Sequence, residues 1–198
     1  MEFQEVVDRR RMVRNFSTDP VPPETVERIL RNALHAPSAG FSQGWAFLVL
    51  DSVADITHFW ASATPPGRGT DTWSTGMRRA PVIIVAMSHK QAYLDRYAAP
   101  DKGWTDRDES RWSAPYWDID TGMAALLMLL TVVDERLGGC LFGIPADSMA
   151  SFRAAFGVPA EYSPIGAIAI GHRLPDTASP SLKRGRRPAT EVVHRGRW

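Results

Sequence analysis

The spacing of apolar residues predicts two amphipathic helices in the first part of the chain, at 2–11 and 25–36. In each segment apolar side chains return every three or four positions, as they do on the buried face of a helix. The repeating positions are Phe3, Val6 and Val7 in the first segment and Val26, Ile29, Leu30 and Ala33 in the second. Pro37 ends the second helix, because proline has no N–H to donate and its ring clashes with the preceding turn.

Short unbroken runs of apolar residues predict buried strands further along the chain. The runs 45–50, 81–87 and 164–171 are compact and bounded by turn-forming or charged residues. Two further helical segments are expected at 56–60 and 148–156. Because helices and strands do not alternate regularly, the order indicates an α+β fold and not a βαβ series.

The longest apolar helix is expected at 120–137, and Gly138 and Gly139 are expected to end it in a loop. This helix has almost no polar side until Asp134. A helix that is apolar on every face must be buried. In a domain of this size the requirement predicts that the helix lies at a subunit interface.

Three segments carry no periodic pattern. Residues 64–70 are rich in Gly and Pro and are expected to form a loop. The segment 93–117 mixes aromatic and charged residues and is interpreted as a lid or excursion, in which Trp104 and Trp112 are candidates to stack on a flat substrate. The segment 174–198 is rich in Pro and Arg without a core pattern, so it is either disordered or wrapped on another surface.

Composition indicates one soluble domain that spans 1–198. The hydrophobic fraction of 44% and the charged fraction of 23% are ordinary for a globular protein. A net charge of +1 argues against a general binder of nucleic acid or membrane surfaces. The longest apolar run, 123–130, is too short to span a bilayer, and no secretory signal is visible, so we expect a cytoplasmic protein.

Few residues suggest side-chain chemistry. The single Cys140 excludes an intramolecular disulfide and a multi-Cys metal site, and without a nearby His it is interpreted as a small residue in a tight loop. The five His residues are scattered, with no metal-ligand spacing. Asp118 and Asp120 lie at a helix start, where capping is the usual role of Asp. The sequence therefore names no catalytic side chain and no metal site.

Positive charge is concentrated near the amino end, at Arg9, Arg10, Arg11 and Arg14. Guanidinium groups present planar, bidentate donors and keep their charge at cellular pH, so such a cluster suits a phosphate dianion. The alternative is a solvated basic stretch, which is the commoner fate of adjacent arginines. Because the whole chain is nearly neutral, the local charge suggests a local anion.

Four motifs, in order along nearly the whole chain, resemble those of the nitroreductase family of flavin-dependent oxidoreductases. They are Arg10-Arg11-x-x-Arg14-x-Phe16, Ala36-Pro37-Ser38 with Ser42-Gln43-x-Trp45, Leu137-Gly138-Gly139-Cys140-Leu141-Phe142-Gly143, and Arg184-Gly185-Arg186-Arg187-Pro188. The resemblance implies a mostly antiparallel central sheet flanked by helices and an intertwined homodimer. It also implies that FMN binds between the subunits and that 174–198 wraps the partner.

The resemblance assigns FMN contacts to three groups of residues. For the phosphate and ribityl chain they are Arg10, Arg11, Met12, Arg14, Arg184 and Arg186, with Arg187 as the alternative to Arg186. For the flavin ring they are Pro37, Ser38, Ala39 and Gln43. Near flavin N5 they are the backbone N–H groups of Phe142 and Gly143, flanked by Cys140 and Leu141. Taken alone, the second group also fits a loop that stops a helix, and the third fits a glycine-rich helix cap.

The chain departs from the family pattern at three positions. Met12 stands where the family usually has Ser, Phe41 where it has Asn, and Gly44 where it has Pro. Phe41 therefore joins Trp104 and Trp112 as a candidate substrate contact. These departures put in doubt any substrate preference carried over from better-known relatives.

The activity implied by the resemblance is an oxidoreductase that takes hydride from NADH or NADPH on FMN. In a ping-pong cycle it then reduces a small, flat, electron-poor acceptor such as a nitroaromatic compound or a quinone. Two alternatives stay open. One is other flavin chemistry on the same fold, namely flavin fragmentation, dehalogenation or a deazaflavin-linked reaction. The other is a non-enzymatic flavin-binding protein.

Overall fold

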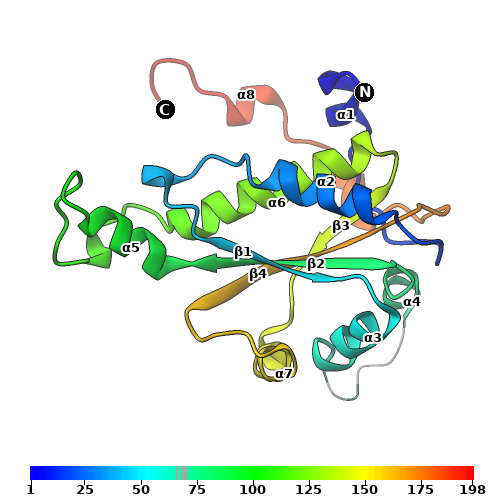
Figure 1. Ribbon diagram of the computed structural model, residues 1–198. Helices are drawn as coiled ribbons and strands as arrows, with labels where there is room; N and C mark the ends of the chain where they lie inside the picture. The colour runs from blue at the N-terminus through cyan, green and yellow to red at the C-terminus, as the bar shows by residue number, and fades with distance from the viewer. Residues whose placement is uncertain (66, 68–70) are drawn as a thin grey trace.

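One four-stranded antiparallel sheet, with strand order β1-β2-β4-β3, forms the centre of the molecule (Figure 1). The structure is a computed structural model that describes residues 1–65, 67 and 71–198. The strands are β1 Trp45–Leu50, β2 Val82–His89, β3 Gly138–Phe142 and β4 Tyr162–Gly171. The three strands predicted from apolar runs are confirmed, and the bounds of β1 match the prediction.

Helices cover both faces of the sheet. The α-helices are α1 Phe3–Arg9, α2 Pro23–Ala33, α3 Val53–Ser62, α4 Thr72–Met77, α5 Lys90–Ala98, α6 Tyr116–Asp134, α7 Met149–Phe156 and α8 Ala189–Val192. Four 3-10 helices are η1 Ala39–Phe41, η2 Glu109–Arg111, η3 Ala146–Ser148 and η4 Pro180–Arg184. In Figure 1, α2 and α6 lie above the sheet, whereas α3, α4 and α7 lie below it. The expected α+β class is confirmed.

Strand β2 is buried on both faces, which explains its unbroken apolar sequence. Val82, Ile84 and Ala86 belong to the core on the side of α2 and α6. Ile83 and Val85 alternate with them and belong to the core on the side of α3 and α7. Successive side chains of a strand point to opposite faces, so a strand between two helical layers is apolar at every position.

Helix α6 has one buried side and one exposed apolar side. Ala124, Met128 and Val132 are fully buried against α2 and the sheet, whereas Ile119 and Leu126 are 43% and 47% exposed. By length and composition α6 passes as a membrane span, but 56% of it is buried within the chain, as in the core helix of a soluble protein. The exposed apolar side agrees with a helix that has surface left for another contact.

The segment 138–142 corrects the prediction of a loop after this helix. It forms β3, which pairs with β4 from Gly138 opposite Gly171 to Phe142 opposite Ala167. Glycine fits closely at the start of β3, because a Cβ on Gly138 would lie 3.0 Å from the Val13 side chain, tighter than most such contacts. The glycines that indicated a helix end therefore serve close packing inside a strand.

Two more expectations need correction. Residues 90–98 form α5 with Tyr93 fully buried, so the first part of 93–117 is a core helix and not an excursion. The loop expected at 64–70 falls partly on residues outside the described part of the chain, and helix α4, which follows it, was not predicted. The Asp71 side chain caps α4 by accepting a hydrogen bond from the Ser74 N–H at 2.7 Å.

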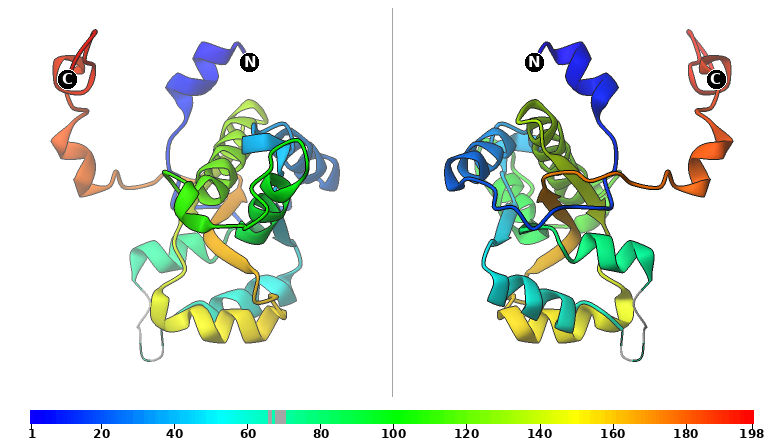
Figure 2. Two further views of the ribbon diagram at one scale, coloured as in Figure 1. Left: turned by 90° about the vertical axis from the view of Figure 1, so that its left-hand side faces the viewer. Right: turned by 90° about the vertical axis from the view of Figure 1, so that its right-hand side faces the viewer.

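Both ends of the chain project from the body. Figure 2 shows α1 and the carboxyl-terminal segment extending away on one side of the sheet. Helix α1 is shorter than predicted and buries only Val6 of its apolar residues, while Phe3 is 72% exposed. The tail from 180 to 198 is exposed throughout, including Leu182 and Trp198. These apolar side chains have no core of their own to enter.

Candidate functional site

The arginine segment after α1 lies beside β3. Met12 forms a parallel bridge with Gly139, and the Val13 N–H donates to the Gly139 carbonyl at 3.0 Å. Two of the motifs, which are far apart in the sequence, are therefore neighbours along one edge of the sheet. The backbone of the arginine segment is held in an extended conformation by this pairing.

The start of the tail fixes the same segment from its other side. The Ser17 N–H donates to the His172 carbonyl, and the Leu174 N–H donates to the Asn15 carbonyl, both at 2.9 Å. The Asp176 carboxylate accepts from the Arg14 N–H at 2.7 Å. Residues 172–176 are therefore ordered on the body, although the sequence offered them no core pattern.

These segments enclose a cavity of about 910 Å³, within the range of small-molecule sites. Its lining includes five of the six residues expected at the flavin phosphate and ribityl chain: Arg10, Arg11, Met12, Arg14 and Arg186. Arg184 is not among the lining residues, and Arg187 instead bonds to the Glu191 carboxylate at 3.3 Å. The geometry thus favours Arg186 over Arg187 at this cavity.

Cys140 is a buried neighbour of this cavity and not a nucleophile in it. Its side chain is 3% exposed, and burial raises the pKa of the thiol, an effect that the nearby Arg14 opposes. A buried, protonated thiol is inert as a nucleophile. Arg14 turns its guanidinium toward the Met12 carbonyl, to which it donates at 2.9 Å.

The residues after Cys140 reach an open edge of the sheet. Leu141 is 37% exposed, and a Cβ built on Gly143 would meet nothing within 4 Å. The Phe142 ring stacks on Trp60 at 5.5 Å with an interplanar angle of 5°, and meets Trp73 edge-on. Sequence reasoning missed Trp60 and Trp73, which hold this ring and with it the backbone at 142–143.

The predicted flavin-ring loop lies elsewhere, at the amino end of α6. The Gln43 N–H donates to the Ser38 hydroxyl at 3.0 Å, and the Ala39 N–H donates to Asp120 at 2.8 Å. The backbone is left-handed at Gly40 and also at Phe41 and Gln43. Exposed members of this loop are Pro37, Phe41 and Gln43.

Asp120 fixes this loop, and its expected capping role is wrong. Helix α6 begins four residues earlier, at Tyr116, so that Asp118 and Asp120 lie inside the helix. Asp120 is 2% exposed and accepts from the Tyr93 hydroxyl at 2.9 Å in addition to the Ala39 N–H. Burial and the Asp120 carboxylate raise the pKa of Tyr93, which stays protonated as a donor.

We expect Asp120→Ala to lower the free energy of unfolding by about 2–6 kcal/mol. The substitution leaves two donors without a partner, and each buried unsatisfied group costs about 1–3 kcal/mol. Urea denaturation measures the change. Tyr93→Phe is the matched control, because it removes one donor and leaves the Ala39 contact in place. Equal effects of the two substitutions would contradict the role given to Asp120.

The two halves of the expected flavin site lie at opposite ends of α6. Ala39 contacts Asp120 near the start of α6. The other end of α6 leads through Glu135, which pairs with Arg28 at 3.2 Å, into β3. An α-helix rises about 1.5 Å per residue, so Asp120 and Asp134 are about 21 Å apart. Within one chain, the loop at 37–43 therefore does not reach the 910 Å³ cavity.

Trp104 and Trp112 lie in an aromatic cluster against α5. The Tyr97 ring is 4.9 Å from Trp104 and 4.5 Å from Trp112 between ring centroids, and the two indoles are 5.6 Å apart. Each tryptophan keeps part of its surface exposed. Their contact with a substrate stays a prediction.

Comparison with known proteins agrees with the motifs. A family model described as the nitroreductase family matches residues 7–172. The chain belongs to the nitroreductase family. Membership in this family supports an oxidoreductase and accounts for the shared order of motifs.

Solved nitroreductase structures share the fold over the whole chain. A nitroreductase in complex with FMN from Desulfovibrio desulfuricans is 24% identical, with a TM-score of 0.71 and coverage of 100% of this chain and 98% of that one. Another nitroreductase in complex with FMN, from Exiguobacterium sibiricum, is 21% identical with a TM-score of 0.72, and 98% and 97% of the two chains are covered. At these identities the likeness shows the fold.

A shorter match links part of the chain to curated proteins. It is 37% identical over 57 residues to iodotyrosine deiodinase 1 from Rattus norvegicus and to the Homo sapiens protein. The match spans 29% of this chain, and 20% and 19% of those two proteins.

Proposed function

We propose that the protein is an FMN-dependent oxidoreductase of the nitroreductase type. The observation that carries the proposal is the pairing of the arginine segment with β3 along one 910 Å³ cavity, through the contacts of Met12 and Val13 with Gly139. This pairing holds the arginine segment beside the glycine-containing strand β3, which supports one site built from both motifs. When bound, FMN supplies the hydride chemistry that the side chains of this cavity lack.

The residues present fit one flavin mononucleotide. Arg10, Arg14 and Arg186 offer donors to a terminal phosphate, since guanidinium groups match phosphate oxygens in geometry and charge. Phe142 stacks on Trp60, and a Cβ on Gly143 would meet nothing within 4 Å, which supports the proposal that the backbone N–H groups at 142–143 donate to a flat ring. Backbone donors stabilise developing charge without titrating.

The complete site requires a second copy of the chain. The loop at 37–43 contacts Asp120 near the start of α6, whereas the arginine segment bonds to Gly139, beyond the other end of this helix. Helix α6 also exposes Ile119 and Leu126 on its outer side. Packing two copies of α6 in opposite directions brings the loop of one chain to the cavity of the other, in a two-fold arrangement that repeats the site. We therefore propose a homodimer with flavin between the subunits. Light scattering measures the mass of this dimer.

The electron donor that we propose is NADH or NADPH, and the acceptor is a flat, electron-poor molecule such as a nitroaromatic compound or a quinone. A protein named NADH dehydrogenase/NAD(P)H nitroreductase from Parabacteroides distasonis shares the fold, with 16% identity, a TM-score of 0.72 and coverage of 99% of both chains. Exposed aromatic surface at Phe41, together with Trp104 and Trp112, supports stacking of a flat acceptor.

The 57-residue match to iodotyrosine deiodinase 1 favours a second candidate, reductive dehalogenation of an aromatic substrate. The two candidates differ in the acceptor and share the flavin. Product analysis with a nitroaromatic compound and with a halogenated phenol distinguishes them.

Anaerobic titration of the purified protein tests the proposed activity. We expect NADH or NADPH to bleach the flavin absorbance near 450 nm in a stoichiometric reaction, and a nitroaromatic compound or quinone to restore it. A flavin that neither nucleotide bleaches would contradict the proposed electron donor. A reduced flavin that no acceptor reoxidises would instead identify a flavin-binding protein.

We expect Arg10→Ala and Arg14→Ala each to weaken FMN binding about ten- to a hundredfold, because a charge-assisted hydrogen bond contributes about 1.5–3 kcal/mol. Arg9→Ala is the matched control, since Arg9 bonds to Glu5 at 2.6 Å and does not line the 910 Å³ cavity. Titration of the apoprotein with FMN measures all three. Equal affinities in the three variants would place the phosphate elsewhere.

A further inference from the structure

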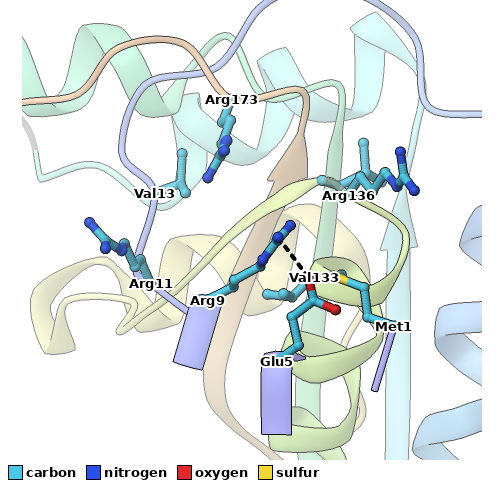
Figure 3. A pocket seen from close by; sticks show the side chains of 9 residues that line it. Met1, Glu5, Arg9, Arg11, Val13, Val133, Arg136 and Arg173 are labelled. Carbon is cyan, nitrogen blue, oxygen red and sulfur yellow. Dashed lines mark ion pairs between the residues drawn. The ribbon is translucent and has the colours of Figure 1, made fainter. Parts of the chain in front are cut away.

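A second cavity adjoins the first, and arginines are the commonest residues in its lining (Figure 3). Its volume is about 630 Å³. It lies between α1, the end of α6 and Arg173, which follows β4. Four guanidinium groups border it, from Arg9, Arg11, Arg136 and Arg173. We call this cavity the arginine pocket.

Although Asp8 borders an adjoining hollow with Arg9, Arg11 and Arg173, most of the positive charge of the arginine pocket is not neutralised by the chain. Its one carboxylate, Glu5, is bonded to Arg9 at 2.6 Å. Among the residues that the structure describes, the side chains of Arg11, Arg136 and Arg173 have neither an ion pair nor a hydrogen bond. Elsewhere in the chain arginines beside α5 are paired, as Arg96 is with Asp101 and Arg107 with Asp95. Like charges around one space, three of them without an ion pair, favour an anion.

The arginines of the pocket stand on fixed backbone. Arg173 forms a bridge with Phe16, and the Arg136 N–H donates to the Val133 carbonyl at 2.9 Å. In Figure 3, Arg9 and Arg173 point toward a common space, and Arg11 and Arg136 stand on either side of it with their guanidinium groups turned outward. A site built on fixed backbone loses little entropy when it binds a ligand.

Arg136 occupies a position that favours glycine. Its φ is +62°, in the left-handed region, directly after α6. Helices commonly place glycine at such a position, because a side chain there is strained. The chain carries a long cationic side chain at this point even though the strain lowers its stability, which agrees with a binding role for the guanidinium.

We propose that the arginine pocket binds a phosphate monoester. Guanidinium groups match two phosphate oxygens at once, and several of them around one space suit a dianion. Val13, Val133 and Leu137 give the pocket an apolar side, which fits an organic group on the phosphate, such as a nucleoside. The pocket shares Arg11, Val13 and Arg173 with the cavity proposed for the flavin phosphate, whereas Arg10, Arg14 and Arg186 line only that cavity. The proposal does not rest on flavin binding.

Isothermal titration calorimetry of the full-length protein as purified tests the pocket. The probes are inorganic phosphate and adenosine 2′-monophosphate, at constant ionic strength. We expect both to bind, and Arg136→Gly to weaken both about tenfold, the loss of one charge-assisted contact. The same substitution is expected to keep the flavin absorbance and to leave the melting temperature unchanged or raise it, since glycine relieves the left-handed strain.

Arg31→Gln is the matched control, because Arg31 is an exposed arginine on α2 outside both cavities. We expect it to bind both probes as the unchanged protein does. If the nucleotide binds more tightly than phosphate, the ligand of the pocket is a nucleotide. If the two affinities are equal, the ligand is free phosphate. Absence of binding by the unchanged protein overturns the proposal, as does an Arg136→Gly affinity equal to that of Arg31→Gln. If the purified protein holds no flavin but binds the probes through Arg136, the proposal for the arginine pocket stands and the proposed flavin function is contradicted.

Discussion

Gly76→Ala is expected to destabilise the protein and to weaken FMN binding together. A Cβ at this position of α4 would overlap the backbone oxygen of Arg14 and lie 3.2 Å from the Asn15 Cα. That backbone is fixed between β3 and residues 172–176, so it has no free direction in which to move. Alanine in place of glycine favours a helix by about 0.5–1 kcal/mol, but overpacking costs about 1–3 kcal/mol, and the cost is larger.

The melting temperature and the FMN affinity measure this effect. For a chain of this size 1 kcal/mol corresponds to about 2–4 °C, so we expect a fall of several degrees in the apoprotein. Thr75→Ala is the control for stability, because Thr75 is exposed on the same helix. If Gly76→Ala were more stable than the unchanged protein, helix propensity would outweigh overpacking at this position. The Arg14 backbone would then not be packed tightly against α4.

Removal of residues 174–198 is expected to abolish FMN binding and dimerisation while β4 stays folded. The tail supplies the Asp176 acceptor for the Arg14 N–H, the Pro175 acceptor for the Asn15 side chain, and Arg186 in the lining of the cavity. Its apolar residues have no core within their own chain, so contact with a second copy is their remaining way to be buried. Flavin occupancy and sedimentation measure the two losses.

The Arg184→Ala, Arg186→Ala double variant separates the roles of the tail. It retains the backbone contacts of residues 172–176, so we expect it to remain dimeric and to lose FMN affinity. Because Arg186 lines the cavity and Arg184 does not, most of the loss is expected from Arg186. A truncated chain that stays dimeric and fully flavinated would remove the tail arginines from the site.

Elements with a strong local pattern were predicted well. The strand at 45–50 and the buried β2 stand out because unbroken apolar runs fit a sheet covered on both faces. Helix α4 was missed because its sequence, TWSTGM, carries no apolar period and is held by its Asp71 cap and by packing. The strand at 138–142 was missed because its glycines resemble a helix end and its strand character comes from pairing with β4.

The site was predictable as motifs but not as geometry. Arg10, Arg14 and the 138–143 segment were named from the resemblance; the structure places both arginines at one cavity and pairs Met12, between them, with Gly139. No local pattern encodes the bridge between Met12 and Gly139, because it joins segments far apart in the chain. The role of Asp120 depends in the same way on Ala39 and Tyr93, which approach it only after folding.

Identification of the chromophore tests the central claim most directly. Protein purified with its native chromophore, or reconstituted with excess flavin, is denatured, and the released compound is identified by mass spectrometry. We expect FMN, one per chain, because Arg10, Arg14 and Arg186 are arranged for one terminal phosphate. Release of FAD, or of no flavin after reconstitution, would contradict the assignment of the cavity.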